Sequence, residues 1–211
     1  ERTAMVGHEF IQACRPGNRY AVKPESDFAQ SLQGELLQRN FLDGDRIHLA
    51  GLTPFLYGMI LEKKWPVLLH QEILSVSREE GGFSVRLGTC GGEERVLCKR
   101  ILDTTAERLS TPGRSVPLKA KYIGATLMRP LGGTSPVPSG EDLSPGRFDS
   151  EAYLRVPLKL DCPWPEAHEA LARRWRNRPA AEADWKVGFI ATSFWKELPI
   201  GPDFLETGWI H

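Results

Sequence analysis

The amino-acid sequence predicts an α/β protein with a three-stranded β-meander in its first half and a mostly β second half. Three observations predict this class. A helix-like stretch at 53–64 precedes a short apolar run at 67–69. Three strand-like segments joined by glycine turns follow within 73–99. Further strand-like segments then surround one predicted helix, at 118–128, 151–160 and 185–195.

The chain before residue 53 is predicted to hold one clear helix. Residues 3–25 show little periodicity and are expected to form a short helical turn or loop and then extended chain. Ser26 or Asp27 can cap a helix that runs to about Asn40, because their side-chain oxygens accept from the first free amides. Residues 41–51 are expected to be a loop.

A second helix is predicted to begin at Thr53-Pro54, where a capping hydroxyl is followed by proline at the first helical position. Trp65-Pro66 is expected to end it. The continuous apolar run Val67-Leu68-Leu69 then favours a short parallel strand that is covered on both faces.

The meander is predicted from alternation and turns. Phe83, Val85 and Leu87 alternate with small or polar residues, which is the period of a half-exposed strand. Glycine pairs at 81–82 and 91–92 separate this strand from segments at 73–77 and 95–99. A final short strand is expected at 101–103, ending in Thr104-Thr105-Ala106.

The second half is predicted to be mostly β with one helix. Residues 118–128, 151–160 and 185–195 have the composition of strands, and Pro165 begins a helix that extends to about Asn177. Residues 129–149 are rich in proline, glycine and serine and are expected to form a long loop.

Composition excludes several classes of function. The chain has 211 residues, 41% of them apolar, with 27 basic and 27 acidic side chains. A neutral chain gives no electrostatic reason to expect nucleic acid or an anionic membrane as a partner. No apolar run approaches the ~18 residues that span a bilayer. The four cysteines show no paired metal-ligand spacing and are expected to be reduced structural thiols of a cytoplasmic protein, with no metal bound.

The stretch WPVLLHQEILSVSREEGGFSVRLGTCGGEERVLCKRILDTTA, residues 65–106, resembles FAD-dependent oxidoreductases of the glutathione-reductase-like fold. The resemblance implies that residues 1–115 form a partial FAD/NAD(P)-binding Rossmann-like domain with the meander inserted. Residues 116–211 would form a substrate or cap region. The expected activity is oxidation or reduction of a small organic substrate through bound FAD.

The resemblance also implies cofactor-binding residues. Glu1 would accept hydrogen bonds from the ribose hydroxyls, Arg2 would flank the adenine, and Gly7 would let the backbone approach the cofactor. The other cofactor-binding residues that the resemblance implies are Ile73, Asp103, Thr104, Thr105 and Ala106. The same residues also suit a solvated terminus and an ordinary strand end. No catalytic residue is predicted, because the flavin carries the chemistry.

Two features depart from the family pattern. The glycine-rich turn that seats the pyrophosphate should lie about 20–30 residues before Glu1, so a complete FAD site requires upstream residues. We therefore interpret the chain as an internal or N-terminally truncated portion. Ala106 also replaces the family's glycine. These departures keep two alternatives open: a non-catalytic binding or assembly subunit on a flavoprotein-like scaffold, and an unrelated α+β ligand-binding protein. The oligomeric state is not predicted.

Overall fold

The computed structural model describes residues 2–17, 20–103, 117–138 and 140–198. Contacts divide the chain into two units, each assembled from separate stretches of sequence. The meander unit comprises residues 1–6, 64–120 and 196–211, and the core unit comprises residues 7–63 and 121–195. The assignment of residues 1–115 to cofactor binding and of 116–211 to substrate binding stays a prediction.

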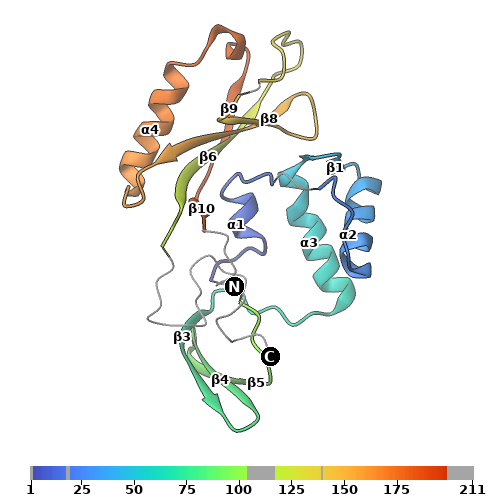
Figure 1. Cartoon of the computed structure of the whole chain (residues 1–211), viewed down its shortest axis with the longest axis vertical. Coiled ribbons are helices and arrows are strands. Elements are labelled where there is room, and N and C mark those ends of the chain that lie inside the picture. The colour runs from blue at the N-terminus through green and yellow to red at the C-terminus, as the bar shows by residue number, and fades with distance from the viewer. Residues whose placement is uncertain (1, 18–19, 104–116, 139, 199–211) are drawn as a thin grey trace. The chain divides into compact units, whose positions relative to one another are not determined.

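The meander unit contains a three-stranded antiparallel sheet in the order β3-β4-β5 (Figure 1). Its strands are β3 (Glu72–Glu79), β4 (Gly82–Thr89) and β5 (Gly92–Cys98). Gly81 and Gly92 lie at the two turns with φ of +84° and +120°, values that favour glycine. The predicted meander strands and turns are thus present, while their insertion into an FAD-binding domain stays a prediction.

The short strands expected on either side of the meander are absent from the described residues. Residues 67–69 belong to no strand, and Val67 and Leu68 are 38% and 49% exposed. The predicted buried parallel strand is therefore wrong here, because an apolar run becomes such a strand only between partner strands and beneath covering helices. Ile101–Asp103 is not a strand either, and Leu102 is 76% exposed.

The first part of the core unit is helical. Ser26 caps α2 as predicted, since its hydroxyl accepts a hydrogen bond from the Ala29 amide at 3.2 Å. The predicted loop at 41–51 instead contains a small hairpin, with Gly44 at its turn at φ +57°. The elements are α1 (His8–Ile11), α2 (Asp27–Gln38), β1 (Leu42–Asp43), β2 (Arg46–Ile47) and α3 (Leu49–Lys63).

Helix α3 begins at Leu49, so the predicted start at Thr53-Pro54 is wrong and Pro54 lies inside the helix. The earlier start has a tertiary cause. The Leu49 amide donates to the Tyr153 hydroxyl at 2.9 Å, which satisfies one of the free amides of the first turn. Leu49 and Gly51 are also buried, so packing favours the additional turn.

The second part of the core unit belongs to a five-stranded sheet in the order β10-β6-β8-β7, with β9 also paired to β6 (Figure 1). By the division into units, Ala120 of β6 and Lys196 and Glu197 of β10 fall in the meander unit. The single strand expected at 185–195 is two strands, because the intervening chain turns away and the Thr192 amide donates to the Gln12 carbonyl at 2.9 Å. The strands are β6 (Ala120–Met128), β7 (Leu143–Pro145), β8 (Glu151–Leu158), β9 (Lys186–Ile190) and β10 (Trp195–Glu197).

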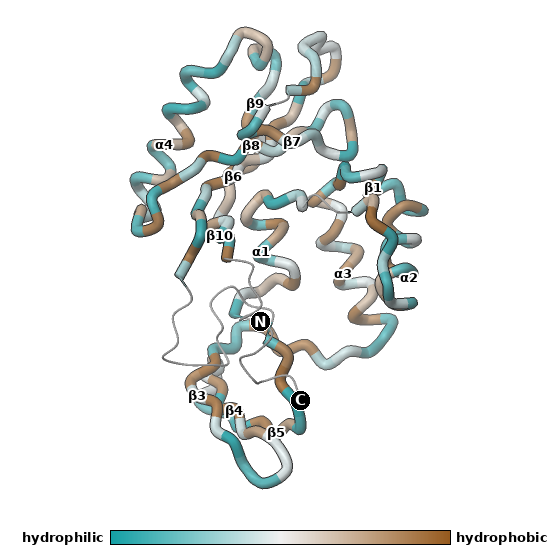
Figure 2. The backbone as a smooth tube through the Cα atoms, viewed as in Figure 1, coloured by the Kyte–Doolittle hydropathy of each residue, from teal (hydrophilic) through white to brown (hydrophobic). Residues whose placement is uncertain are grey.

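Helix α4 (Trp164–Arg176) packs on β8 and agrees with the predicted helix to within a residue at each end. Figure 2 shows it as a mainly hydrophilic helix, and only Ala167 and Leu171 on it are buried. Arg174 connects the C-terminal end of α4 to two carboxylates. Its Nε lies 2.6 Å from the Asp142 carboxylate, and its other two guanidinium nitrogens donate to the buried carboxylate of Glu182. These carboxylates raise the pKa of Arg174.

The segment after α1 crosses β6 at Gly124. A Cβ atom on Gly124 would lie 2.4 Å from the Ala13 carbonyl oxygen and 2.9 Å from the Cys14 Cβ. On the same residue, the Gly124 carbonyl accepts from the Ala191 amide at 3.0 Å. Cys14 is 1% exposed, and burial raises the pKa of its thiol to about 11, so it is a core residue and not a nucleophile at neutral pH.

Gly124→Ala should destabilise the core unit by roughly 1–3 kcal/mol, because the methyl group meets backbone that cannot move aside easily. Gly34→Ala is the matched control. Gly34 lies within α2 with nothing within 4 Å of the added Cβ, so the same change should stabilise by roughly 0.5–1 kcal/mol. Urea unfolding followed by circular dichroism measures both. Equal stability of the two variants would contradict the close crossing.

Candidate functional site

The N-terminal segment of the chain lies beside the start of the meander. The His70 amide donates to the Thr3 carbonyl at 3.2 Å, and an Arg2 guanidinium nitrogen lies 3.2 Å from the Glu72 carboxylate. His70 has a φ of +55°, a left-handed turn immediately before β3. Two stretches about seventy residues apart, one predicted around the adenine and one around Ile73, therefore lie side by side.

Arg2 and Glu72 form an exposed ion pair, with side-chain exposures of 47% and 62%. Exposed pairs of this kind contribute about 0–1 kcal/mol to stability. Ile73 is half-buried and is paired with Leu87 on β4. A bulge follows it at Leu74, between the registered pairs of Ile73 and Ser75. Bulges redirect neighbouring side chains.

The other predicted cofactor-binding residues are not brought together with Arg2 and Ile73 in the described part of the structure. Asp103 is half-buried and is the last described residue before the range 104–116. Gly7 belongs to the core unit, where it precedes α1 at φ +77°, and a Cβ there would lie 2.9 Å from Leu56 Cδ1. Its conformation and packing thus account for glycine without a cofactor. Glu1, Thr104, Thr105 and Ala106 lie outside the described residues.

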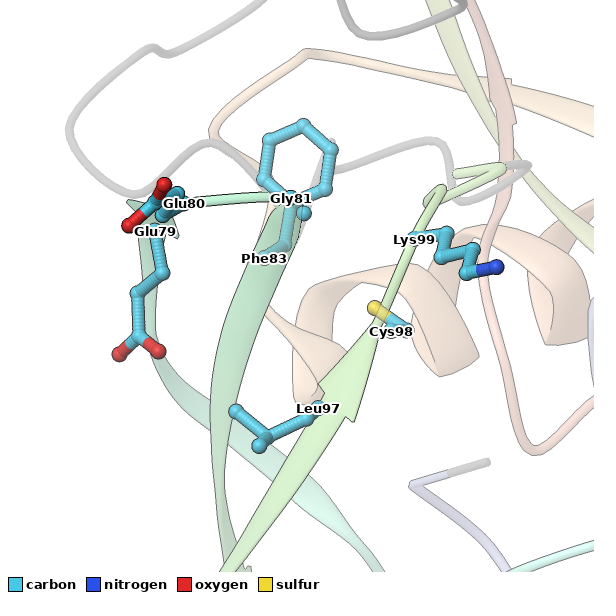
Figure 3. A pocket seen from close by; sticks show the side chains of 8 residues that line it. Glu79, Glu80, Gly81, Phe83, Leu97, Cys98 and Lys99 are labelled. Carbon is cyan, nitrogen blue, oxygen red and sulfur yellow. The ribbon is translucent and has the colours of Figure 1, made fainter.

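A hollow lies at the end of the meander where β3, β4 and β5 converge (Figure 3). Phe83 and Leu97, from neighbouring strands, form its apolar part, while Lys99 and the glutamates Glu79 and Glu80 lie at opposite ends. Because these charges do not converge on one point, the hollow offers no arrangement for acid–base chemistry or for holding a phosphate.

The described part of the chain contains neither a candidate metal site nor a candidate membrane-spanning helix. The described residues contain no group of three or more histidine, cysteine, aspartate or glutamate side chains that could hold a metal ion. The search of the same residues finds no helix with the length and apolar character of a membrane span. All four cysteines are free thiols; Cys14 and Cys162 are buried, and Cys90 is exposed.

A buried polar network that sequence reasoning missed joins β2, α3 and β8. Glu151 Oε1 lies 2.9 Å from His48 Nδ1 and 2.8 Å from the Tyr153 hydroxyl oxygen. Burial, followed by the nearby Glu151 carboxylate, raises the pKa of Tyr153. Glu151 Oε2 has no hydrogen-bond partner among the described contacts.

The surroundings of this histidine–carboxylate pair indicate a structural role. Glu151 is 2% exposed, and the His48 ring lies between Phe41 and Phe148, with centroid distances of 6.0 and 5.1 Å. A Cβ on Gly146 would lie 2.5 Å from Glu151 Cγ, so backbone also closes over the carboxylate. A substrate has no direct approach to it. The pairing spans 103 residues, so no local spacing in the sequence could have revealed it.

Tyr153→Phe should destabilise the protein by about 1–2 kcal/mol, because the Leu49 amide and the Glu151 carboxylate both lose a partner in the core. Tyr122→Phe is the control, since no hydrogen bond of that hydroxyl occurs among the described contacts. Thermal and urea unfolding of the two variants measure the difference. If Tyr153→Phe and Tyr122→Phe lose equal stability, the hydrogen bonds of the Tyr153 hydroxyl do not stabilise the contact between α3 and the sheet.

Comparison with known proteins gives only weak likenesses. No family model matches the chain, and no curated protein matches it. Solved structures that resemble it include p-nitrophenol 4-monooxygenase PnpA from Pseudomonas putida DLL-E4, at 13% identity and a TM-score of 0.42 over 68% of this chain and 42% of that one. Aklavinone-11 hydroxylase, solved with FAD and aklavinone, resembles it at 15% identity and a TM-score of 0.44 over 74% and 32%.

A third solved structure is CabE, an aromatic hydroxylase from angucycline biosynthesis, at 14% identity and a TM-score of 0.46 over 70% of this chain and 33% of that one. The chain thus spans less than half the length of each of these proteins. At these TM-scores the likenesses carry no argument about the fold or activity of this chain, so its function is argued from its own residues.

Proposed function

We propose that this chain is the adenosine-binding portion of an FAD-dependent oxidoreductase that acts on a small organic substrate. The single observation that carries the proposal is the pairing of the N-terminal segment with the start of the meander, through Thr3 with His70 and Arg2 with Glu72. This pairing supports the expectation that Arg2 and Ile73 contribute to one side of the same ligand.

Within this proposal, the chain's own residues bind and orient the cofactor. The Glu1 carboxylate accepts from the ribose hydroxyls, Arg2 leaves Glu72 to lie along the adenine, and Asp103 with Thr104 and Thr105 borders the adenosine. When bound, the flavin ring supplies the hydride or electron-pair chemistry. Residues 116–211 contribute the substrate region. Free cysteines fit a cytoplasmic setting, which belongs to the same proposal.

A second candidate is a non-catalytic binding or assembly protein. Its specific support is Ala106 in place of the family glycine. The strand pairs with a defined register are all antiparallel, which also agrees with an α+β ligand-binding protein unrelated to flavoenzymes. Flavin content separates both alternatives from the leading proposal.

The proposal predicts flavin absorbance in the purified intact protein and a higher melting temperature when FAD is added. Arg2→Gln should weaken FAD binding by roughly threefold to tenfold, because one cation–π contact to the adenine is lost. Arg86→Gln is a matched control: Arg86 is also an exposed arginine of the meander unit paired with a glutamate, Glu93. Absence of both flavin and stabilisation by FAD would overturn the proposal.

A further inference from the structure

The outer edge of β5 is a free strand edge within the described structure. β5 is the last strand in the order β3-β4-β5, so β4 is its one strand partner among the described residues. A free edge presents a row of amide and carbonyl groups that another chain can pair with. Residues 92–95 of β5 are exposed, and Leu97 is 67% exposed. The edge is therefore accessible along most of its length.

β5 also lacks the features that commonly keep a strand edge from pairing. Its register with β4 runs without a shift from Gly92 to Cys98, and the strand contains neither proline nor lysine. Other edges of the described sheets differ. The edge strand β3 has a bulge at Leu74, and β7 is three residues long and ends in Pro145. Bulges, prolines and short strands prevent pairing with a further chain, so β5 is open to one.

The charges of β5 allow one antiparallel register with a second copy of the same strand. In such a pairing one residue lies opposite its own copy, and the others lie opposite residues equally far on its other side. A register centred on Glu94 or on Arg95 sets that residue opposite the same charge. A register centred on Leu97 sets Arg95 opposite Lys99. Like charges directly opposite destabilise a sheet, and a register centred on Val96 avoids them all.

The register centred on Val96 is complementary in charge and in apolar surface. Glu93 lies opposite Lys99 of the second copy at both ends of the pairing. Lys99 forms no ion pair among the described contacts, and Figure 3 shows it at one end of the hollow, opposite the glutamates. The exposed Leu97 lies opposite Arg95, whose aliphatic stem covers apolar surface. The opposed pairs are Glu93–Lys99, Glu94–Cys98, Arg95–Leu97 and Val96–Val96.

Contacts within each copy are compatible with this pairing. Glu93 already pairs with Arg86 of β4, and both side chains are more than half exposed. A carboxylate accepts several hydrogen bonds, so it can bind a second cation beside the first. Arg95 pairs with Glu79 of β3 through its guanidinium group, which leaves the stem to lie along the second copy.

We propose that this chain forms a two-fold symmetric dimer in which β5 pairs antiparallel with β5 of a second copy, centred on Val96. The pairing joins two three-stranded meanders into one continuous sheet of six strands. Backbone hydrogen bonds along the edge supply the affinity, and the Glu93–Lys99 pairs select the register. The inference does not depend on flavin binding.

Sedimentation velocity of the full chain between about 5 and 500 µM tests the dimer. The fraction that sediments as a dimer should rise with concentration. Lys99→Glu should raise the dissociation constant at least about tenfold, because two attractive pairs become repulsive. Lys64→Glu is the matched control: it makes the same charge change at an exposed lysine of the meander unit that lies outside the strands. A chain that stays monomeric throughout, or an equal effect of both variants, would overturn the inference.

A charge exchange tests the register. Glu93→Lys and Lys99→Glu should each weaken the dimer when alone, since each sets like charges opposite at both ends. An equimolar mixture of the two variants should form a mixed dimer with an affinity near that of the unaltered chain, because both ends again pair opposite charges. Failure of the mixture to dimerise would contradict the register. Should Glu93→Lys fail to fold after losing its contact with Arg86, the comparison of Lys99→Glu with Lys64→Glu decides.

Discussion

The close crossing at Gly124 is the constraint on which the core unit depends. Only a residue without a Cβ lets the Ala13 carbonyl and Cys14 lie directly on β6. The crossing brings the segment after α1 to the chain between β9 and β10, where the Gln12 carbonyl accepts from the Thr192 amide. It also places Arg15 beside Trp195.

The Tyr153 hydroxyl performs a comparable role between α3 and the sheet. It accepts from the first amide of α3 and contacts the buried carboxylate of Glu151, which in turn contacts His48. Helix, hairpin and β8 are thereby fixed through one buried network. In the meander unit, the contacts of the N-terminal segment with the start of β3 include a backbone hydrogen bond at Thr3 and an exposed ion pair at Arg2.

Local signals in the sequence predicted the elements that local chemistry determines. The Ser26 cap, the meander turns at Gly81 and Gly92, and the proline start of α4 are such cases. Elements that depend on distant residues could not be predicted. The start of α3 is set by a tyrosine 104 residues away, and the break between β9 and β10 is accompanied by a hydrogen bond to Gln12. For the same reason the sequence did not reveal the His48–Glu151 pair. The placement of Arg2 beside Glu72 adds a contact that no spacing rule predicts.

The central claim is that the N-terminal segment and the first strand of the meander together form the adenosine side of a cofactor site. Hydrogen exchange of the full chain, followed by mass spectrometry with and without FAD, tests this most directly. The account predicts slower exchange at residues 2–5 and 70–74 when FAD is present, with no change at the turn between β4 and β5. Unchanged exchange in both segments, or protection confined to the core unit, would contradict it.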